Sequence, residues 1–269
     1  MANFYETNQL NQQLFNNQYI IIKDIENNIV DTRKYIKKDD KEEFLKLKKN
    51  TFTSNLLGKI KPKDVYQECL IDALLNNINN NCNVTTIKGK AGSGKTFFAL
   101  HYCFWGLENG TFDKIYIAIN PAKANNSVGL GFYPGTKDEK LGMSGIGNIL
   151  SSKLGSKTMV DELIKTDKIE LLPICDIRGF ETRRKSVLYL PESQNLDIYL
   201  MQLTLQRVGE ETKVIIDGDI DTQVDNVYYE GEKNGMRRVS EIFKGSDIYN
   251  EVTLKNIYRS AVGVLADKM

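Results

Sequence analysis

The chain has 269 residues, 41% of them apolar and 26% charged, and this length predicts one main α/β domain with a smaller appendage. A formal net charge of only +1 gives no bulk electrostatic reason for a nucleic-acid partner, so a basic binding surface would have to be local. Four cysteines without a C-x-x-C pair argue against zinc and disulfide frameworks, and the lack of a leader pattern or of a run of about 20 apolar residues predicts a soluble, cytoplasmic protein without a membrane span.

The first 60 residues are rich in Asn, Gln and Lys, and we expect them to form the appendage, with the main domain over 61–269. Two short β-branched runs, at 19–23 and 29–31, flank an Asn-Asn turn and predict a hairpin. The charged segment 37–49 is then expected to be a helix with few apolar anchors. Because acidic residues dilute its positive charge, we interpret it as a solvated helix rather than a nucleic-acid arm.

From Pro62 onward, strand patterns alternate with helix patterns, which predicts a mostly parallel sheet with helices on both faces. Several strand candidates are near-continuous apolar runs, as is typical of strands buried on both faces. The expected strands are 84–88, 114–119, 168–173, 185–190, 213–216 and 248–254. The expected helices are 96–108, 140–150, 160–165, 196–208, 236–243 and 260–268.

A complete phosphate-binding loop connects the expected strand 84–88 to the expected helix 96–108. The glycines of such a loop let backbone N–H groups face phosphate oxygens, and the start of the helix adds positive potential. Lys95 is expected to reach the β- and γ-phosphates and the Thr96 hydroxyl to bind Mg²⁺, so the sequence predicts ATP and Mg²⁺ as ligands. The loop consists of Gly89, Lys90, Ala91, Gly92, Ser93, Gly94, Lys95 and Thr96.

An acidic residue, Glu192, follows the apolar run 187–190, where the end of a strand would deliver a carboxylate to the γ-phosphate and its metal. Glu192 is suited to polarise the attacking water, and capping of the next helix is the plainer alternative. Pro191 stands where an acid normally precedes such a residue. A proline can neither bind metal nor donate to the sheet.

A second strand end, at 214–219, places Asp219 beyond the sheet, and Gln223 follows four residues later. A Gly-Asp pair followed by Gln can sense the γ-phosphate and couple its loss to movement of a bound polymer, while a polar turn is the simpler interpretation. Gln67, near the start of a helix, can read adenine through its amide or is an ordinary surface glutamine. Arg259 is the best candidate for a nucleotide-sensing arginine, acting in its own subunit or the next.

A long glycine-rich segment follows the expected strand 114–119. In it, Phe132 and Tyr133 lie close in sequence to Lys123 and Lys137. Aromatic faces flanked by cations can grip a single strand of nucleic acid without reading its sequence. Alternatively, these aromatic residues fold back onto the domain, and the sequence favours neither.

Taken in order, these motifs resemble the PhoH-like family of P-loop ATPases, related to superfamily 1 helicases, and most closely its phage-encoded branch. The resemblance covers the chain from about Pro62 to the C-terminus. It implies a RecA-like core, ATP hydrolysis, action on RNA or single-stranded DNA, and a homo-oligomer, with a hexameric ring as one form, in the host cytoplasm if phage-encoded. The matching positions are Gln67, 89–96, 121–135, 177–179, 192–195, 218–219 with Gln223, and 258–260.

The chain departs from this family in two motifs. The family's Asp-Glu-Ala-Gln-Asn is here Pro-Glu-Ser-Gln-Asn at 191–195, which lacks the Mg²⁺-anchoring aspartate, and the family's Arg before Pro121 is Asn120. A second hypothesis therefore stays open, that of an ATP-gated oligomeric binding protein with slow or no turnover. A third, a nucleotide or small-molecule kinase, is disfavoured by the Gly-Asp pair followed by Gln223.

Overall fold

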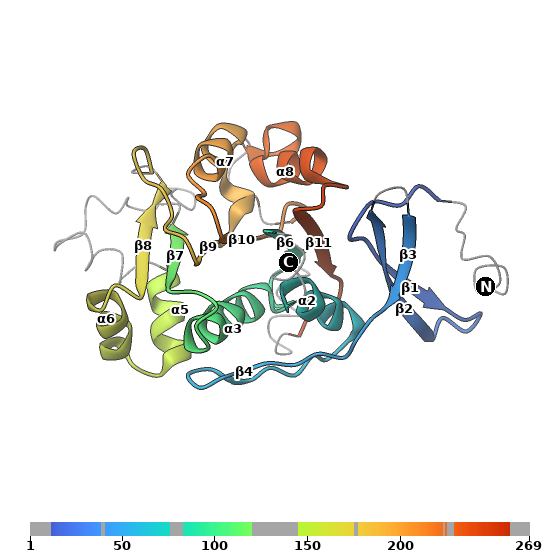
Figure 1. The fold of residues 1–269 in the computed structure, drawn as a ribbon, viewed down its shortest axis with the longest axis horizontal. Helices are drawn as coiled ribbons and strands as arrows, with labels where there is room; N and C mark the ends of the chain where they lie inside the picture. The colour runs from blue at the N-terminus through green and yellow to red at the C-terminus, as the bar shows by residue number, and fades with distance from the viewer. Residues whose placement is uncertain are drawn as a thin grey trace.

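The computed structural model of the chain describes residues 12–38, 41–75, 83–119, 145–174, 177–222, 224 and 229–258. In these residues a six-stranded parallel sheet lies between two layers of helices, and a three-stranded antiparallel sheet lies at one end of the molecule (Figure 1). None of the described helices is long and apolar enough to cross a membrane.

The large sheet has the spatial order β11-β6-β10-β9-β7-β8, and every neighbouring pair of strands is parallel. All six strands begin and end within two residues of the ranges expected from the sequence. Every residue of β9 and β10 is buried, which agrees with the apolar runs 187–190 and 214–216 that they contain. The strands are β6 (Val84–Gly89), β7 (Lys114–Ile119), β8 (Ile169–Pro173), β9 (Ser186–Leu190), β10 (Thr212–Gly218) and β11 (Tyr249–Leu254).

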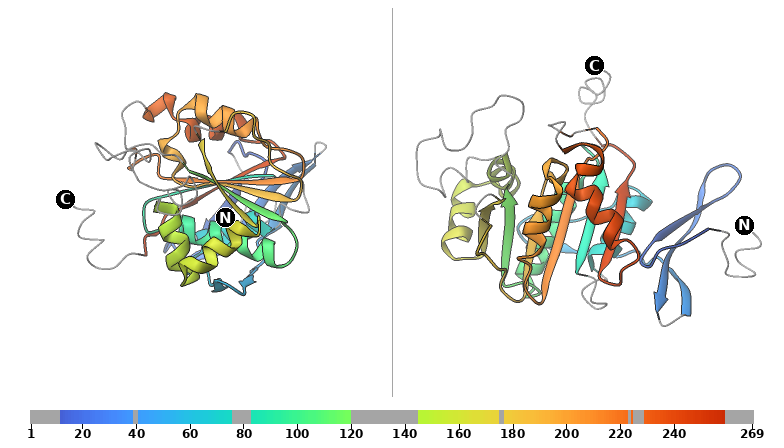
Figure 2. Two further views of the ribbon diagram at one scale, coloured as in Figure 1. Left: turned by 90° about the vertical axis from the view of Figure 1, so that its left-hand side faces the viewer. Right: turned by 90° about the horizontal axis from the view of Figure 1, so that it is seen from above.

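Helices cover both faces of this sheet, which Figure 2 shows edge-on in its left view. Because successive side chains of a strand point to opposite faces, Val187 and Tyr189 of β9 join the core under α2, α3, α5 and α6, while Leu188 and Leu190 join the core under α7 and α8. The helices are α2 (Val65–Leu75), α3 (Lys95–Glu108), α5 (Gly145–Leu154), α6 (Lys157–Lys165), α7 (Ile198–Leu205) and α8 (Gly235–Phe243).

Two of the expected helices reach beyond the described residues. The helix expected over 140–150 is described from Gly145 onward, as α5, and the helix expected over 260–268 lies outside the described residues. Two others begin at capping side chains: Ser156 accepts from the N–H of Met159 at the start of α6, and Asp197 accepts from the N–H of Leu200 at the start of α7. These caps satisfy N–H groups that a helix leaves without a partner, so they fix where each helix begins.

The predicted hairpin near the N-terminus is confirmed. Strand β1 (Tyr19–Lys23) pairs antiparallel with β2 (Ile29–Lys38). In the turn, the Asp24 carboxylate accepts from the N–H of Glu26 at 2.9 Å and from the N–H of Asn28 at 2.8 Å. Asn27 has a φ of 71°, a left-handed conformation that asparagine tolerates better than most residues.

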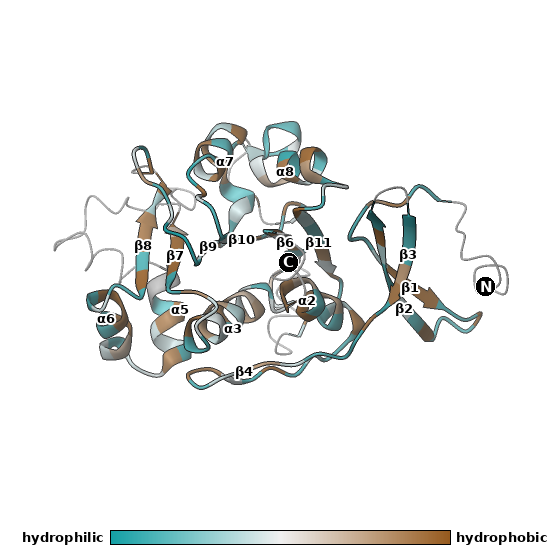
Figure 3. Cartoon of the chain, in the orientation of Figure 1, coloured by the Kyte–Doolittle hydropathy of each residue, from teal (hydrophilic) through white to brown (hydrophobic). Residues whose placement is uncertain are grey.

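The prediction of a helix over 37–49 is wrong. Residues 37 and 38 complete β2, and β3 (Lys41–Lys46) pairs antiparallel with it, so that Phe44 lies opposite Tyr35 with 5.4 Å between ring centres. Strand β3 is coloured hydrophilic over much of its length in Figure 3. A charged segment with few apolar residues has only a weak intrinsic preference for helix or strand, so pairing with a neighbouring strand decides its conformation.

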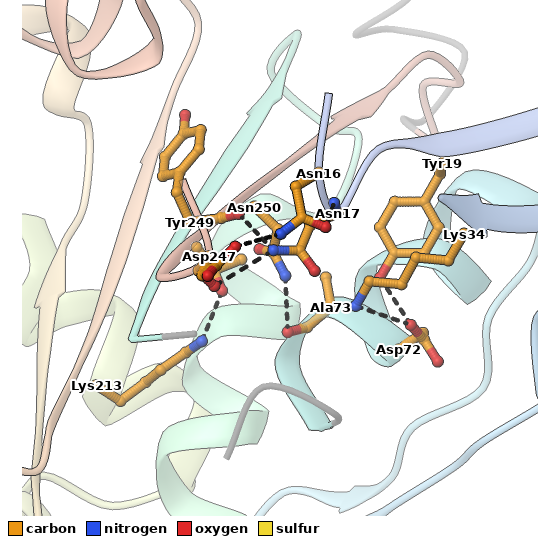
Figure 4. Close-up of polar contacts among 11 residues, drawn as sticks. Asn16, Asn17, Tyr19, Lys34, Asp72, Ala73, Lys213, Asp247, Tyr249 and Asn250 are labelled. Atoms are coloured by element: carbon orange, nitrogen blue, oxygen red, sulfur yellow. Dashed lines mark hydrogen bonds and ion pairs between the residues drawn. The ribbon is translucent and has the colours of Figure 1, made fainter. Parts of the chain in front are cut away.

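Polar contacts hold the three-stranded sheet to the rest of the molecule (Figure 4). The Asn17 amide donates to the carbonyl oxygen of Tyr249 at 3.0 Å, and Asn16 donates to the Asp247 carboxylate at 2.6 Å. On α2, the Asp72 carboxylate accepts from the Tyr19 hydroxyl at 2.7 Å and lies 3.7 Å from the Lys34 ammonium. The small sheet is therefore docked on α2 and β11 rather than joined by the chain alone.

Residues 52–60 lie along α3. They form the two-stranded pair β4 (Thr53–Ser54) and β5 (Gly58–Lys59), and the side chains of Phe52 and Ile60 are buried in the core that α3 covers. The Glu108 carboxylate at the end of α3 accepts from the Ser54 hydroxyl at 2.8 Å. These contacts hold one side of the helix that follows the phosphate-binding loop.

Candidate nucleotide-binding site

The loop between β6 and α3 has a backbone that glycine adopts at least cost. Gly89, Gly92 and Gly94 have φ of 152°, 82° and 103°. A Cβ atom on Gly89 would lie 2.7 Å from the carbonyl oxygen of Leu254 in the neighbouring strand β11. No side chain of the described residues caps α3, so the positive end of this helix is left to the loop.

Two polar side chains of the loop fit a bound phosphate group. Lys95 is only 6% exposed, and its ammonium donates to the carbonyl oxygens of Gly89 at 2.7 Å and Lys90 at 3.3 Å. The Ser93 hydroxyl is buried and has no hydrogen-bond partner among the described residues. A buried polar group without a partner is costly, and a phosphate oxygen would supply the missing acceptor. The residues present therefore fit the phosphates of a nucleotide.

Gln67 of α2 braces the loop. Its amide nitrogen donates to the carbonyl oxygen of Ser93 at 3.2 Å, and its amide oxygen accepts from the N–H of Lys63 at 2.8 Å. The side chain is buried, so Gln67 is not the surface glutamine that was one of the two interpretations. The amide nitrogen has a second hydrogen and the amide oxygen a second lone pair, so these two bonds leave a donor and an acceptor that adenine could use.

The segment after β11 also lies on the loop. The N–H of Tyr258 donates to the carbonyl oxygen of Gly92 at 2.9 Å, and its hydroxyl donates to the Asp64 carboxylate at 2.5 Å. The Lys63 ammonium lies 4.7 Å from the centre of the Tyr258 ring. Arg259, the candidate nucleotide-sensing residue that follows, lies outside the described residues.

Asp217, in β10, lies in the site and is absent from the residues predicted from the sequence. Its buried carboxylate accepts hydrogen bonds from the Tyr189 hydroxyl at 2.6 Å, from the N–H of Glu192 at 3.0 Å and from the Thr96 hydroxyl at 3.4 Å. Burial raises the pKa of Asp217 to about 6, although the hydrogen bond from Tyr189 opposes the rise. A carboxyl group perturbed in this way is typical of functional sites. The signal in the sequence is an apolar run, 214–216, that ends in an acid.

Glu192 lies just beyond β9, in a left-handed conformation with φ 49° and ψ 39°. Its carboxylate is exposed and accepts from the Gln194 amide at 2.6 Å. Glu192 makes no capping bond, and Asp197 caps α7 instead, so the interpretation of Glu192 as a helix cap is wrong. A left-handed backbone at a residue other than glycine costs about 1–3 kcal/mol and is found most often at functional sites.

Gln194 links Glu192 to the end of β10. Its amide oxygen accepts from the N–H of Asp219 at 3.2 Å, while its amide nitrogen binds Glu192. The Asp219 carboxylate accepts from the N–H groups of Asp221 at 3.3 Å and Thr222 at 3.0 Å. The hydrogen bonds of the Asp219 carboxylate are thus those of the polar turn. Gln223 lies outside the described residues.

The predicted nucleic-acid segment cannot be placed relative to this site, because all of its named residues lie outside the described part of the chain. They are Asn120, Pro121, Lys123, Phe132, Tyr133 and Lys137.

The glycine-rich loop joins the parallel strand β6 to α3 and contains a buried lysine, and β10 lies between β6 and β9 in the sheet. This arrangement defines a P-loop NTPase of RecA-like fold. The model of the PhoH-like protein family matches residues 59–264, and the chain belongs to this family of P-loop ATPases.

Curated relatives agree with the family assignment. The chain is 29% identical over 213 residues to Protein PhoH2 of Mycolicibacterium smegmatis, 30% over 226 residues to Protein PhoH2 of Bacillus subtilis, and 30% over 225 residues to the PhoH-like protein of Bacillus subtilis. These matches cover 78%, 82% and 82% of the chain, and 47%, 50% and 67% of the relatives. The chain therefore spans about half the length of the two PhoH2 proteins.

Two solved structures show weaker similarity. The DnaC helicase loader matches at 12% identity and a TM-score of 0.36, over 73% of this chain and 94% of that chain. The Pif1 helicase from Candida albicans matches at 17% identity and a TM-score of 0.36, over 77% of this chain and 43% of that chain. Similarities of this size carry no argument about function.

Proposed function

We propose that the chain binds ATP with Mg²⁺, hydrolyses it, and couples hydrolysis to the remodelling of RNA or single-stranded DNA as a helicase-like motor. The observation that carries the proposal is the meeting of a hydroxyl and two acids beside the phosphate-binding loop. Thr96 is the last residue of the loop, and its hydroxyl contacts Asp217 of β10. Glu192, just beyond the neighbouring strand β9, donates its N–H to the same carboxylate. Hydrolysis needs such acids in addition to a phosphate cradle.

The loop residues would bind the phosphates. Lys95 would exchange the carbonyl oxygens of Gly89 and Lys90 for the β- and γ-phosphates, and Thr96 would hold Mg²⁺. The ion, when bound, neutralises charge that develops on the phosphates.

Glu192 would polarise the attacking water, because its carboxylate is exposed while its N–H is fixed by Asp217, which also contacts the Thr96 hydroxyl. Glu192 binds the Gln194 amide, and Gln194 accepts from the N–H of Asp219. Through these two bonds, loss of the γ-phosphate would alter the position of the segment that contains Gln223. We assign γ-phosphate sensing to Gln223 and charge stabilisation to Arg259.

The partners follow from the same proposal. Phe132 and Tyr133, with Lys123 and Lys137, would bind the single strand. The chain would form a homo-oligomer, such as a hexameric ring, and act in the cytoplasm, or in the host cytoplasm if it is phage-encoded. Residues 61–269 would form the ATPase unit. Residues 1–60 would be an appendage fixed to that unit by the contacts of Asn17 and Asp72.

The proposal is tested by phosphate release with and without single-stranded RNA or DNA, from the wild type and Glu192→Gln. Loss of the water-polarising carboxylate should lower the rate by about 10²- to 10⁴-fold and leave ATP binding intact. Glu162→Gln, an exposed position on α6, is the matched control and should keep the wild-type rate. Equal phosphate release from the wild type and Glu192→Gln would refute the proposed role of Glu192.

The second candidate function is ATP-gated binding or assembly without turnover, and Pro191 at the end of β9 favours it because no acid is present there. It predicts that ATP changes the mass of the particle in solution while no phosphate is released. Light scattering and phosphate release on the same sample separate the two functions.

A further inference from the structure

The strand register places an acid level with Pro191, on the neighbouring strand. In the pairing of β10 with β9, Ile216 lies opposite Leu190, so the next residue of β10, Asp217, is level with Pro191. On its other side β10 pairs with β6, where Asp217 lies opposite Ile87, two residues before the loop begins at Gly89. Asp217 is therefore nearer in the sheet to the phosphate-binding strand than a residue at the end of β9 is.

The side chain of Asp217 points to the residue that would hold the metal. Its carboxylate lies 3.4 Å from the Thr96 hydroxyl, the expected Mg²⁺ ligand, and its other oxygen accepts from the N–H of Glu192 at 3.0 Å. Mg²⁺ in nucleotide sites is bound by one or two carboxylates together with the phosphates and water. Asp217 supplies a carboxylate between the phosphate loop and the water-polarising Glu192.

No basic side chain of the described residues forms an ion pair with Asp217, although its carboxylate is completely buried. Burial raises the pKa of this carboxyl group by more than the charge of Lys95 lowers it. A buried carboxylate is stable when a cation or several donors compensate it. Two of its three donors, the hydroxyls of Tyr189 and Thr96, are neutral side chains. A cation bound beside Thr96 would supply the compensation.

We propose that Asp217 anchors the Mg²⁺ ion of the bound nucleotide together with Thr96, and so takes the place of the acid that is missing at Pro191. This inference rests on the proposed function, since it concerns the same nucleotide site. It moves the metal-anchoring carboxylate from the end of β9 to β10, and it removes the reason to expect poor turnover from Pro191.

The test is the Mg²⁺ dependence of nucleotide affinity, measured with fluorescent mant-ATP as Mg²⁺ is titrated against EDTA. In EDTA, the wild type and Asp217→Asn should bind mant-ATP within about twofold of each other. As Mg²⁺ is added, the wild type should gain affinity, and Asp217→Asn should need about 10- to 100-fold more Mg²⁺ for the same gain. Asp72→Asn, a second buried aspartate on α2, is the matched control and should titrate like the wild type.

A rescue variant separates anchoring of the metal from a role in folding. Adding Pro191→Asp to Asp217→Asn restores a carboxylate level with position 217 on β9, and it should shift the Mg²⁺ titration back toward the wild type. Asparagine keeps one oxygen, which can accept from the N–H of Glu192, and its NH2 group can donate to the hydroxyl oxygen of Tyr189. Asp217→Asn should therefore fold, as circular dichroism would show.

Two results would overturn the proposed role of Asp217, and a third would overturn the proposed function. An identical Mg²⁺ titration for Asp217→Asn and the wild type would overturn this inference and leave the proposed function standing. An Asp217→Asn chain that does not fold would assign the residue to the fold and also overturn the inference. A wild type that does not bind mant-ATP under any condition would overturn the proposed function itself.

Discussion

The space at the end of β10 is narrow, and one methyl group there would disturb the site. A Cβ atom on Gly218 would lie 2.7 Å from the Gln194 amide oxygen, 2.7 Å from the Met236 sulfur and 3.0 Å from the Gln194 backbone nitrogen. Gln194 is also the residue that binds Glu192. Because Gly218 has no side chain, Gln194, which follows β9, can pack closely against the end of β10.

We predict that Gly218→Ala lowers the free energy of unfolding by about 1–3 kcal/mol, because the overpacked groups have to move. It should also reduce phosphate release, since Gln194 positions Glu192. Urea denaturation measures the first effect, and Ser152→Ala, an exposed position on α5, serves as a control that should change stability by less than about 0.5 kcal/mol. Unchanged stability for Gly218→Ala would contradict the packing described here.

Single residues of the site differ in how well the sequence predicts them. Lys95 and Thr96 can be predicted from a local pattern, because the whole phosphate-binding motif lies in eight consecutive residues. Asp217 does not, because its position depends on where β10 ends and how it pairs. The Gly-Asp pair followed by Gln singles out Asp219 in the sequence, and no comparable motif marks Asp217. The structure continues β10 to Gly218, which leaves Asp217 inside the sheet beside Thr96 and Asp219 in the turn.

At the scale of elements, burial decides which predictions hold. The strands β7, β9 and β10 are buried throughout, and each contains a run of apolar residues that identifies it in the sequence. Strand β3 is exposed and charged, and its strand conformation comes from pairing with β2. A local sequence pattern carries no information about this pairing, and the pattern at 37–49 by itself predicts a helix.

The edge strand β11 carries a charge pair with β6 that gives the sheet a dependence on pH. Glu251 lies 2.9 Å from the Lys88 ammonium, and its carboxylate accepts from the Tyr249 hydroxyl at 2.8 Å. Burial by itself would raise the pKa of Glu251, but the charge of Lys88 and the hydrogen bonds outweigh burial and lower it. A carboxyl group whose pKa is lowered by folding stabilises the native state above its ordinary pKa and loses that effect as pH falls.

We predict that Glu251→Gln is less stable than the wild type at pH 7 by about 1 kcal/mol, and that the difference shrinks as pH falls below about 4.5. Urea denaturation across this range measures the difference. Glu241→Gln is the matched control, since Glu241 and Arg238 are half exposed and such pairs contribute little. A difference between Glu251→Gln and the wild type that stays constant with pH would contradict the assignment to this charge pair.

At the scale of the whole molecule, three separate parts of the chain meet around α2. The small N-terminal sheet docks on it through Asp72, the phosphate loop is braced by Gln67, and the segment after β11 reaches Asp64, just before the helix begins, through Tyr258. Because all three contacts involve one helix and the residue before it, a change at the loop has a direct structural route to the N-terminal sheet. The sequence predicted the nucleotide loop but not this arrangement, which depends on contacts between residues far apart in the chain.

The most direct test of the central claim is phosphate release from the wild type and Lys95→Ala, side by side, with ATP, Mg²⁺ and single-stranded RNA. Lys165→Ala, an exposed lysine at the end of α6, serves as the control. If the chain is a P-loop ATPase that acts on a single strand, the wild type and Lys165→Ala release phosphate at a rate that RNA or single-stranded DNA increases, and Lys95→Ala falls to background. Equal phosphate release from the wild type and Lys95→Ala would contradict the account.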